Sequence, residues 1–244
     1  MSERVWLSVF LFALAFGAKV HAEGIADAVP KNSRQLVLVV APDWGSPRAL
    51  FRRYERGHGE ARWREVGESC DALLGEHGLA WGLGLHTSPH GEARRKIEGD
   101  RCAPAGVFRL PFAFGRSSAA QFVIARFPYQ QLAPDTEAVD DPSSRFYNRV
   151  VRRSQVAAPD WKTSERMAEL ADYELGVAVA HNAKNIPGAG SCIFLHRWRG
   201  ERTGTAGCTV LREAHLLELI RWLDAEKHPV LVQLPRRELP ANFP

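Results

Sequence analysis

Residues 190–210 read GSCIFLHRWRGERTGTAGCTV, and this stretch says most about the fold. An apolar run typical of a buried strand ends at His196. Eleven mostly polar residues follow, and Thr205-Ala206-Gly207 leads into Cys208. Because glycine allows a sharp turn, the loop can fold back and bring the strand end and the cysteine together. The pattern predicts a strand, a loop and a turn, with a histidine and a thiol facing each other.

Short apolar segments bounded by glycine, proline and polar residues predict strands on both sides of this stretch. The predicted strands are 35–41, 48–54, 61–66, 107–110, 121–125, 175–180, 191–196 and 230–234, with one more short strand and tight turns within 72–84. Residues 128–160 are rich in proline, aspartate and serine, which predicts a long ordered loop or a series of turns, and whether this segment is a lid stays open.

Two helices are expected. One spans 164–173 with Ser164 as its cap, and the other begins after the Gly207-Cys208 turn. In the second helix apolar residues repeat at helical spacing, at Leu216, Leu219, Ile220 and Leu223. The sequence thus predicts a mainly β single domain over 35–234 with one or two peripheral helices, between a polar lead-in (23–34) and a polar tail (235–244).

Residues 1–22 have the features of a secretory signal peptide. Arg4 precedes a 13-residue apolar run, and Val20-His21-Ala22 offers small residues at the cleavage positions. The run is short for a membrane span. We therefore expect cleavage after Ala22, no stable membrane span and a periplasmic location, with an uncleaved anchor as the alternative.

The formal net charge of +4 is mild and spread along the chain. Basic clusters such as Arg94-Arg95-Lys96 lack interleaved aromatic residues, so nucleic acid is not an expected partner. They are interpreted as solvated faces or as loosely suited to an anionic polymer such as cell wall. The four cysteines have no zinc-type spacing, and neither a metal nor a cofactor is expected.

A thiol becomes a nucleophile when a neighbouring imidazolium or helix N-terminus lowers its pKa. His196 and the helix expected after Cys208 suit that role, and the N–H groups of Gly207 and Cys208 suit an oxyanion hole. The alternative interpretation is a structural histidine beside a packed or disulfide-bonded cysteine.

These residues resemble the L,D-transpeptidase catalytic domains of peptidoglycan synthesis. The family signature is a strand ending in His, a variable loop and Ser/Thr-x-Gly-Cys, which 193–196 and 205–208 match. Glu98-Gly99-Asp100 with 104–108 (PAGVF) resembles a second family segment. A third, more subgroup-like resemblance is Asp140-Asp141-Pro142 with Tyr147-Asn148 and Trp161. The matches follow the family order.

The resemblance implies a β-sandwich or barrel and a role in cell-wall biogenesis and cell shape. Cys208 would attack the bond between the third residue and D-alanine of a peptidoglycan stem peptide and form an acyl-thioester. His196 would be the general base and acid, with its other ring nitrogen held by the carbonyl of Arg197. Gly207 would contribute to the oxyanion hole.

One position departs from the family. Many members carry Arg or Asn two residues after the cysteine, where this chain has Val210. Thr205 is a candidate substrate contact, and Arg197, Arg199 or Arg212 are candidates for binding a stem-peptide carboxylate. Hydrolysis by the same acyl-enzyme, including release of a wall-linked protein, stays an alternative to transfer. So does a non-catalytic wall-binding protein in which Cys192 is bonded to Cys208.

If Cys208 is the nucleophile, it must be a free thiol. Cys192 and His196 on one strand would be roughly 13 Å apart, which places Cys192 badly for pairing with Cys208. We therefore predict a Cys70–Cys102 disulfide, worth about 3–4 kcal/mol, and a buried, reduced Cys192.

Three other groups of residues have a structural and a functional interpretation. His181-Asn182 is predicted to be a strand-end turn, and Asp140 with Asp141 is predicted to be structural rather than an acid–base pair. Whether Trp161 and Phe146-Tyr147 line a cleft or cover the core stays open.

Overall fold

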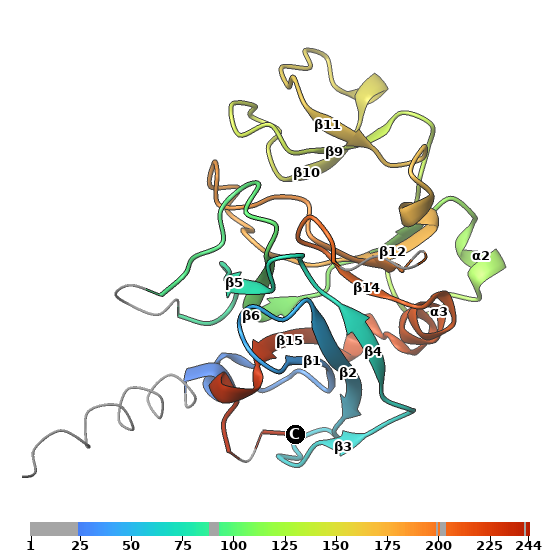
Figure 1. Ribbon diagram of the computed structural model, residues 1–244. Coiled ribbons are helices and arrows are strands. Elements are labelled where there is room, and N and C mark those ends of the chain that lie inside the picture. Colours follow the sequence, from blue (N-terminus) through green and yellow to red (C-terminus); the bar gives the residue numbers. More distant parts are fainter. Residues whose placement is uncertain (1–23, 88–92, 199, 201–203, 242) are drawn as a thin grey trace, which may run out of the picture.

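The computed structural model describes residues 24–87, 93–198, 200, 204–241 and 243–244, so the predicted signal peptide lies outside the described residues. The described chain is mainly β, as predicted (Figure 1). Its large sheet has twelve strands: β1 (Gln35–Ala41), β2 (Arg48–Glu55), β3 (Arg64–Glu65), β4 (Cys70–Leu73), β5 (Leu79–Trp81), β6 (Ala103–Arg109), β7 (Ala113–Gly115), β8 (Tyr129–Gln131), β12 (Leu175–Ala178), β13 (Phe194–Arg197), β14 (Thr209–Leu211) and β15 (Val230–Pro235).

The strand order of this sheet brings distant segments together. It runs β5-β6-β15-β1-β2-β4-β14-β13-β12-β7-β8, and β3 pairs with β2. β1 is parallel to β15, with Leu36 opposite Val230, and antiparallel to β2, with Val37 opposite Arg53. Residues 36–39 of β1 are at most 1% exposed. A strand buried on both faces has a continuous apolar sequence, which is why β1 is recognisable from sequence.

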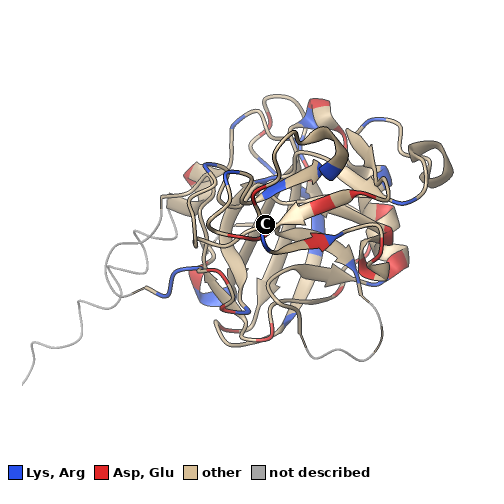
Figure 2. Cartoon of the chain, turned by 90° about the horizontal axis from the view of Figure 1, so that it is seen from above, with Lys and Arg blue, Asp and Glu red and all other residues tan. Residues whose placement is uncertain are grey.

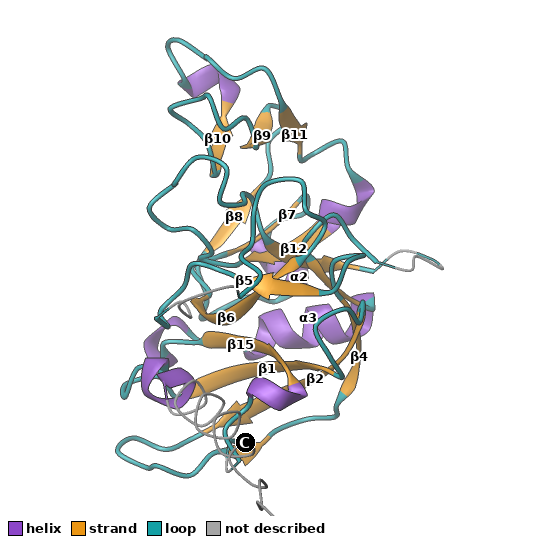
Figure 3. Ribbon diagram, turned by 60° about the vertical axis from the view of Figure 1, so that its left-hand side comes forward, coloured by secondary structure: helices purple, strands orange, loops and turns teal. Residues whose placement is uncertain are grey.

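Helix α3 (Glu213–Trp222) packs against β12 and β13 (Figure 3). Leu216, Leu219 and Ile220 are fully buried, which confirms the predicted apolar face. The helix begins after the Gly207-Cys208 turn, as predicted, but β14 lies between the turn and the helix. The helix N-terminus therefore does not adjoin the thiol.

A second sheet of three strands stands at the top of the molecule in Figure 1. Its order is β10 (Arg149–Arg152), β9 (Thr136–Val139), β11 (Ser164–Arg166). The predictions of a loop over 128–160 and of a helix over 164–173 are therefore wrong. The Ser164 hydroxyl donates to Glu137 on β9 at 2.7 Å instead of capping a helix, and only residues 171–174 form a 3-10 turn.

The strand expected at 121–125 is also wrong. Residues 119–122 form helix α2 (Ala119–Phe122), which is closed by a reciprocal capping box. The backbone N–H of Gln121 donates to the Ser118 hydroxyl at 3.4 Å, and the backbone N–H of Ser118 donates to the Gln121 side chain at 3.0 Å. These local bonds satisfy helix-terminal donors and outweigh the apolar composition.

The predicted Cys70–Cys102 disulfide is contradicted, because both residues are free thiols. A side chain on Gly75 would meet the Cys102 backbone, so Cys102 lies beside Gly75, five residues along the chain from Cys70. β4 runs extended from Cys70 to Leu73, which spans about 10 Å before the chain reaches Gly75.

Charged segments of both signs are interspersed around the fold (Figure 2). Lys96 departs from the interpretation of its basic cluster as a solvated face, since it is only 6% exposed. Within the described ranges no helix combines the length and the apolar character needed to cross a membrane.

Candidate active site

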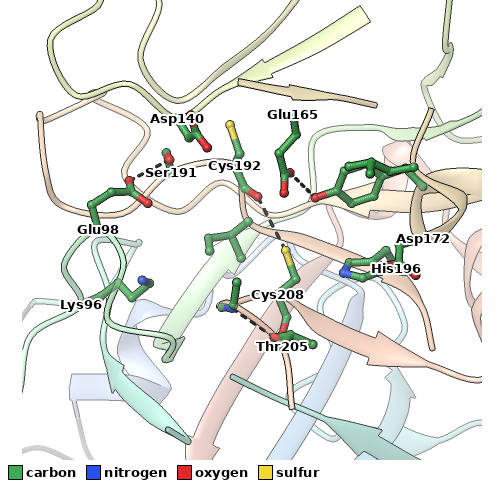
Figure 4. A pocket seen from close by; sticks show the side chains of 15 residues that line it. Lys96, Glu98, Asp140, Glu165, Asp172, Ser191, Cys192, His196, Thr205 and Cys208 are labelled. Atoms are coloured by element: carbon green, nitrogen blue, oxygen red, sulfur yellow. Dashed lines mark hydrogen bonds between the residues drawn. The ribbon is translucent and has the colours of Figure 1, made fainter. Parts of the chain in front are cut away.

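The parallel pair β13–β14 places His196 and Cys208 side by side. Leu195 lies opposite Thr209 and His196 opposite Val210, so Cys208 enters the sheet at the level of Phe194. The backbone N–H of Phe194 donates to the Cys208 sulfur at 3.3 Å. In Figure 4 a ring nitrogen of His196 points toward this sulfur. The two residues singled out from the sequence thus share one site.

The His196 ring is held in a defined orientation. Its Nδ1 lies 3.2 Å from the carbonyl oxygen of Arg197, the contact expected for that residue. A carbonyl only accepts, so Nδ1 carries the proton and Nε2 is the basic nitrogen of the neutral ring. The Tyr173 ring packs edge-on against the imidazole, with centroids 5.3 Å apart at 83°. Both contacts restrict rotation of the ring.

The turn before Cys208 is closed by Thr205. Its hydroxyl donates to the Cys208 carbonyl at 2.5 Å and accepts from the Gly207 N–H at 3.1 Å. Gly207 has φ +153°, and a Cβ there would lie 3.1 Å from the Cys102 carbonyl. Glycine is therefore needed for the turn, but its N–H is engaged by Thr205. The expectation that this N–H is free for an oxyanion is not met.

Thr205, His196, Gly207 and Cys208 line a pocket of about 190 Å³. The candidate arginines do not. Arg197 binds Glu213 at 3.1 Å and the Ala171 carbonyl at 2.8 Å, and Arg212 lies over the Trp198 ring at 5.1 Å. Arg199 lies outside the described residues.

Four carboxylates line the same pocket, and sequence reasoning missed all of them as site residues: Glu98, Asp140, Glu165 and Asp172. Figure 4 shows them around Cys208. The only signal for Glu98 and Asp140 was their place in the quoted family segments. Among the described residues there is no metal-holding group of three or more His, Cys, Asp or Glu side chains.

Buried hydroxyl groups hold two of these carboxylates. The Tyr147 hydroxyl donates to Glu98, as does the Ser191 hydroxyl at 2.8 Å. The Tyr173 hydroxyl donates to Glu165. Anchored carboxylates keep a fixed charge distribution in the pocket even when it is empty of substrate.

The aromatic residues left open by the sequence cover the core. Trp161 is 8% exposed, contacts Phe146 edge-on and donates from its indole N–H to Glu137 at 2.6 Å. Tyr147 is 1% exposed. None of the three lines the pocket, so their role here is to stabilise the small sheet and to hold Glu98.

The electrostatic environment favours a neutral thiol. Burial, followed by the charge of Glu165, raises the pKa of Cys208 to about 12. Burial also raises the pKa of the Glu165 carboxyl. The expected lowering of the Cys208 pKa is therefore wrong for the resting site, and any thiolate has to be formed by proton transfer during the reaction.

Cys192 lies closer to Cys208 than predicted. It precedes β13, has a left-handed backbone with φ +51°, and its carbonyl oxygen lies 3.7 Å from the Cys208 sulfur. The assumption of an extended strand from Cys192 to His196 was wrong. The Cys192 thiol donates instead to the Val139 carbonyl at 3.4 Å. Both cysteines are free, as the nucleophile hypothesis requires.

His181 and Asn182 form a structural turn, as predicted. Asn182 has φ +53°, and the His181 ring accepts from the Leu83 N–H at 3.2 Å and faces the Ala189 carbonyl at 2.9 Å. Burial lowers the pKa of His181 to about 4. The ring is therefore neutral near pH 7 and fastens the loop that leads to β13.

A cysteine directly before β14 and an oriented histidine on the neighbouring β13 define a cysteine–histidine site on a mainly β domain. The family model described as YkuD, the L,D-transpeptidase catalytic domain, matches residues 46–232. The chain belongs to this family, and the resemblance is confirmed. It is an enzyme of the L,D-transpeptidase type that acts on peptidoglycan. No curated protein and no solved structure matches the chain.

Proposed function

We propose that the protein is an exported L,D-transpeptidase that forms an acyl-thioester on Cys208, with His196 as general base and acid. One observation carries the proposal. Cys208 lies beside an oriented His196 in the pocket of a chain that belongs to this family.

In the first half-reaction, Nε2 of His196 takes the thiol proton as the sulfur attacks the carbonyl between the third residue and D-alanine. The Phe194 N–H, 3.3 Å from the sulfur, supports the developing thiolate. The C–N bond then breaks, and His196 returns the proton to the departing amine. D-alanine leaves, and the thioester remains.

In the second half-reaction, an acceptor amine attacks the thioester, a C–N bond forms and the C–S bond breaks. His196 takes a proton from the amine and returns it to the sulfur. An amine arrives largely as an ammonium ion, which the carboxylates of Glu98, Asp140, Glu165 and Asp172 attract, and it releases one proton to solvent before the neutral amine attacks. This charge favours an amine over water and supports transfer over hydrolysis.

Export is the second part of the proposal and rests on residues 1–22. The mature chain then begins at Glu23 and acts in the periplasm. N-terminal sequencing or intact-mass analysis of periplasmic material tests this. Full-length chain in the membrane fraction would instead support an anchored enzyme.

The reaction is tested by incubating the mature protein with purified tetrapeptide muropeptides and a panel of amines, with Cys208→Ala as the matched control. Mass spectrometry should show D-alanine release and an amine adduct of the tripeptide product. Tripeptide alone with every acceptor would replace transferase by hydrolase. Release of protein from purified wall would indicate the amidase alternative, and binding without turnover the non-catalytic one.

A further inference from the structure

Attack of a thiolate on a peptide carbonyl places a negative charge on the carbonyl oxygen, and that charge needs a fixed donor. The Gly207 N–H is engaged by the Thr205 hydroxyl at 3.1 Å. The pocket wall otherwise carries four carboxylates, which repel an oxyanion. A positive group near Gly207 would stabilise this charge in addition to the Cys208 N–H, and this inference rests on the proposed function.

Lys96 is the cationic side chain that lines the described pocket. Its side chain is only 3% exposed. It lies against the turn that precedes Cys208, since its Cε is 3.7 Å from the place where a Gly207 Cβ would stand. In Figure 4 Lys96 enters the pocket on the side opposite His196. In the tetrahedral intermediate, the oxyanion then faces Lys96 and the leaving amine faces His196.

The ammonium group of Lys96 is oriented by two described bonds. It donates to the Ile97 carbonyl at 2.8 Å and to Asp100 Oδ1 at 2.6 Å. Asp100 is itself fixed, because it accepts from the backbone N–H groups of Cys102 at 2.9 Å and Ile97 at 3.0 Å. An ammonium has three N–H donors, so a third donor is available to a substrate oxygen.

We propose that Lys96 is a catalytic residue that stabilises the oxyanion formed when Cys208 attacks a carbonyl, and that Asp100 positions it. The oxygen gains its charge as the C–S bond forms and accepts a hydrogen bond from the Lys96 ammonium. When the C–N bond breaks, the oxygen returns to a carbonyl and the bond weakens. Lys96 stays protonated throughout.

The charge of Lys96 already acts on the nucleophile, since it lowers the pKa of Cys208 against the larger effect of burial. If the Lys96–Asp100 pair were purely structural, its loss would slow acylation of Cys208 no more than it slows other reactions of the same thiol. That difference separates the two roles.

The test compares two reactions of Cys208 that need no peptidoglycan. Acylation by p-nitrophenyl acetate passes through an oxyanion, whereas alkylation by iodoacetamide does not. Lys96→Met should slow acylation about a hundredfold, as expected for loss of an oxyanion donor, and slow alkylation far less. Nitrophenolate release and the mass of the Cys208 peptide give the two rates.

Two further variants separate chemistry from folding. Lys96→Met with Asp100→Asn removes both charges and avoids a buried unpaired carboxylate; it should show the same selective loss of acylation. Arg95→Met removes an exposed neighbouring cation and should change neither rate. Circular dichroism melting confirms that each variant is folded.

An equal loss of acylation and alkylation in the folded double variant would overturn the proposal. The proposal would also be overturned if Lys96→Met lowered the turnover of muropeptides that end in a free carboxylate but left acylation by p-nitrophenyl acetate unchanged. Lys96 would then bind that carboxylate. The outcome can also separate the two proposals. If p-nitrophenyl acetate acylates Cys208 of the wild-type protein, and Lys96→Met slows that acylation, but the wild type releases no D-alanine, the proposed function fails and the role of Lys96 stands.

Discussion

The floor and the walls of the pocket have different origins. The floor, His196 with residues 205–208, comes from one continuous stretch of chain. The walls carry Glu98, Asp140, Glu165 and Asp172 from separate segments, including the small sheet. The floor supplies the reacting atoms, whereas the walls supply charge that opposes the thiolate. A reactive pair can thus be local in sequence while the field that acts on it is assembled by the fold.

The largest expected effect concerns the floor. Cys208→Ala and, separately, His196→Ala should each abolish D-alanine release, because a nucleophile and its base act as a unit. The measurement is D-alanine release with detection of the covalent adduct by intact-mass spectrometry. Wild-type turnover by Cys208→Ala would show that the nucleophile lies elsewhere.

The second prediction concerns His181, which fastens the loop entering the floor. Its pKa of about 4 in the folded protein lies below the unfolded value of about 6.5. The unfolded chain therefore binds the proton more readily, so the stabilisation is complete above pH 6.5 and is lost as pH falls to about 4. Linkage gives up to about 3 kcal/mol. Urea unfolding of wild type and His181→Gln across this range should show that the free energy of unfolding depends less on pH in the variant. The same pH dependence in both proteins would contradict this prediction.

The third prediction concerns the wall. Glu165→Gln removes the charge that, after burial, most raises the pKa of Cys208, while the amide oxygen can still accept from Tyr173. The thiolate fraction should rise, and alkylation near pH 7 should accelerate about tenfold. Glu98→Gln is the matched control and should have a smaller effect. Equal acceleration of alkylation in both variants would mean that Glu165 affects the Cys208 thiol no more than Glu98 does.

The smallest expected effect separates wall from floor. Trp161→Phe removes the bond to Glu137 in the small sheet and should lower the free energy of unfolding by about 1–2 kcal/mol. Cys208 alkylation should stay within about twofold of wild type, since Trp161 does not line the pocket. A large change in alkylation would show that the two regions are not independent.

The sequence was informative where burial leaves a periodic or continuous apolar pattern. β1 and the buried face of α3 were predicted for this reason. Prediction failed where polar side chains set the local structure. The Ser118–Gln121 capping box turned a predicted strand into α2, and the bond from Ser164 to Glu137 replaced a predicted helix cap. Such bonds depend on partners that a spacing pattern does not reveal.

The sequence by itself determined the mainly β class, the family and the neighbouring His196 and Cys208, because these follow from short segments with fixed local chemistry. The tertiary structure alone decided that Cys70 and Cys102 are free thiols, that Thr205 engages the Gly207 N–H, and that Lys96 lines the pocket. It also decided the pKa of Cys208, since burial and the nearby Glu165 charge depend on which distant segments surround the thiol.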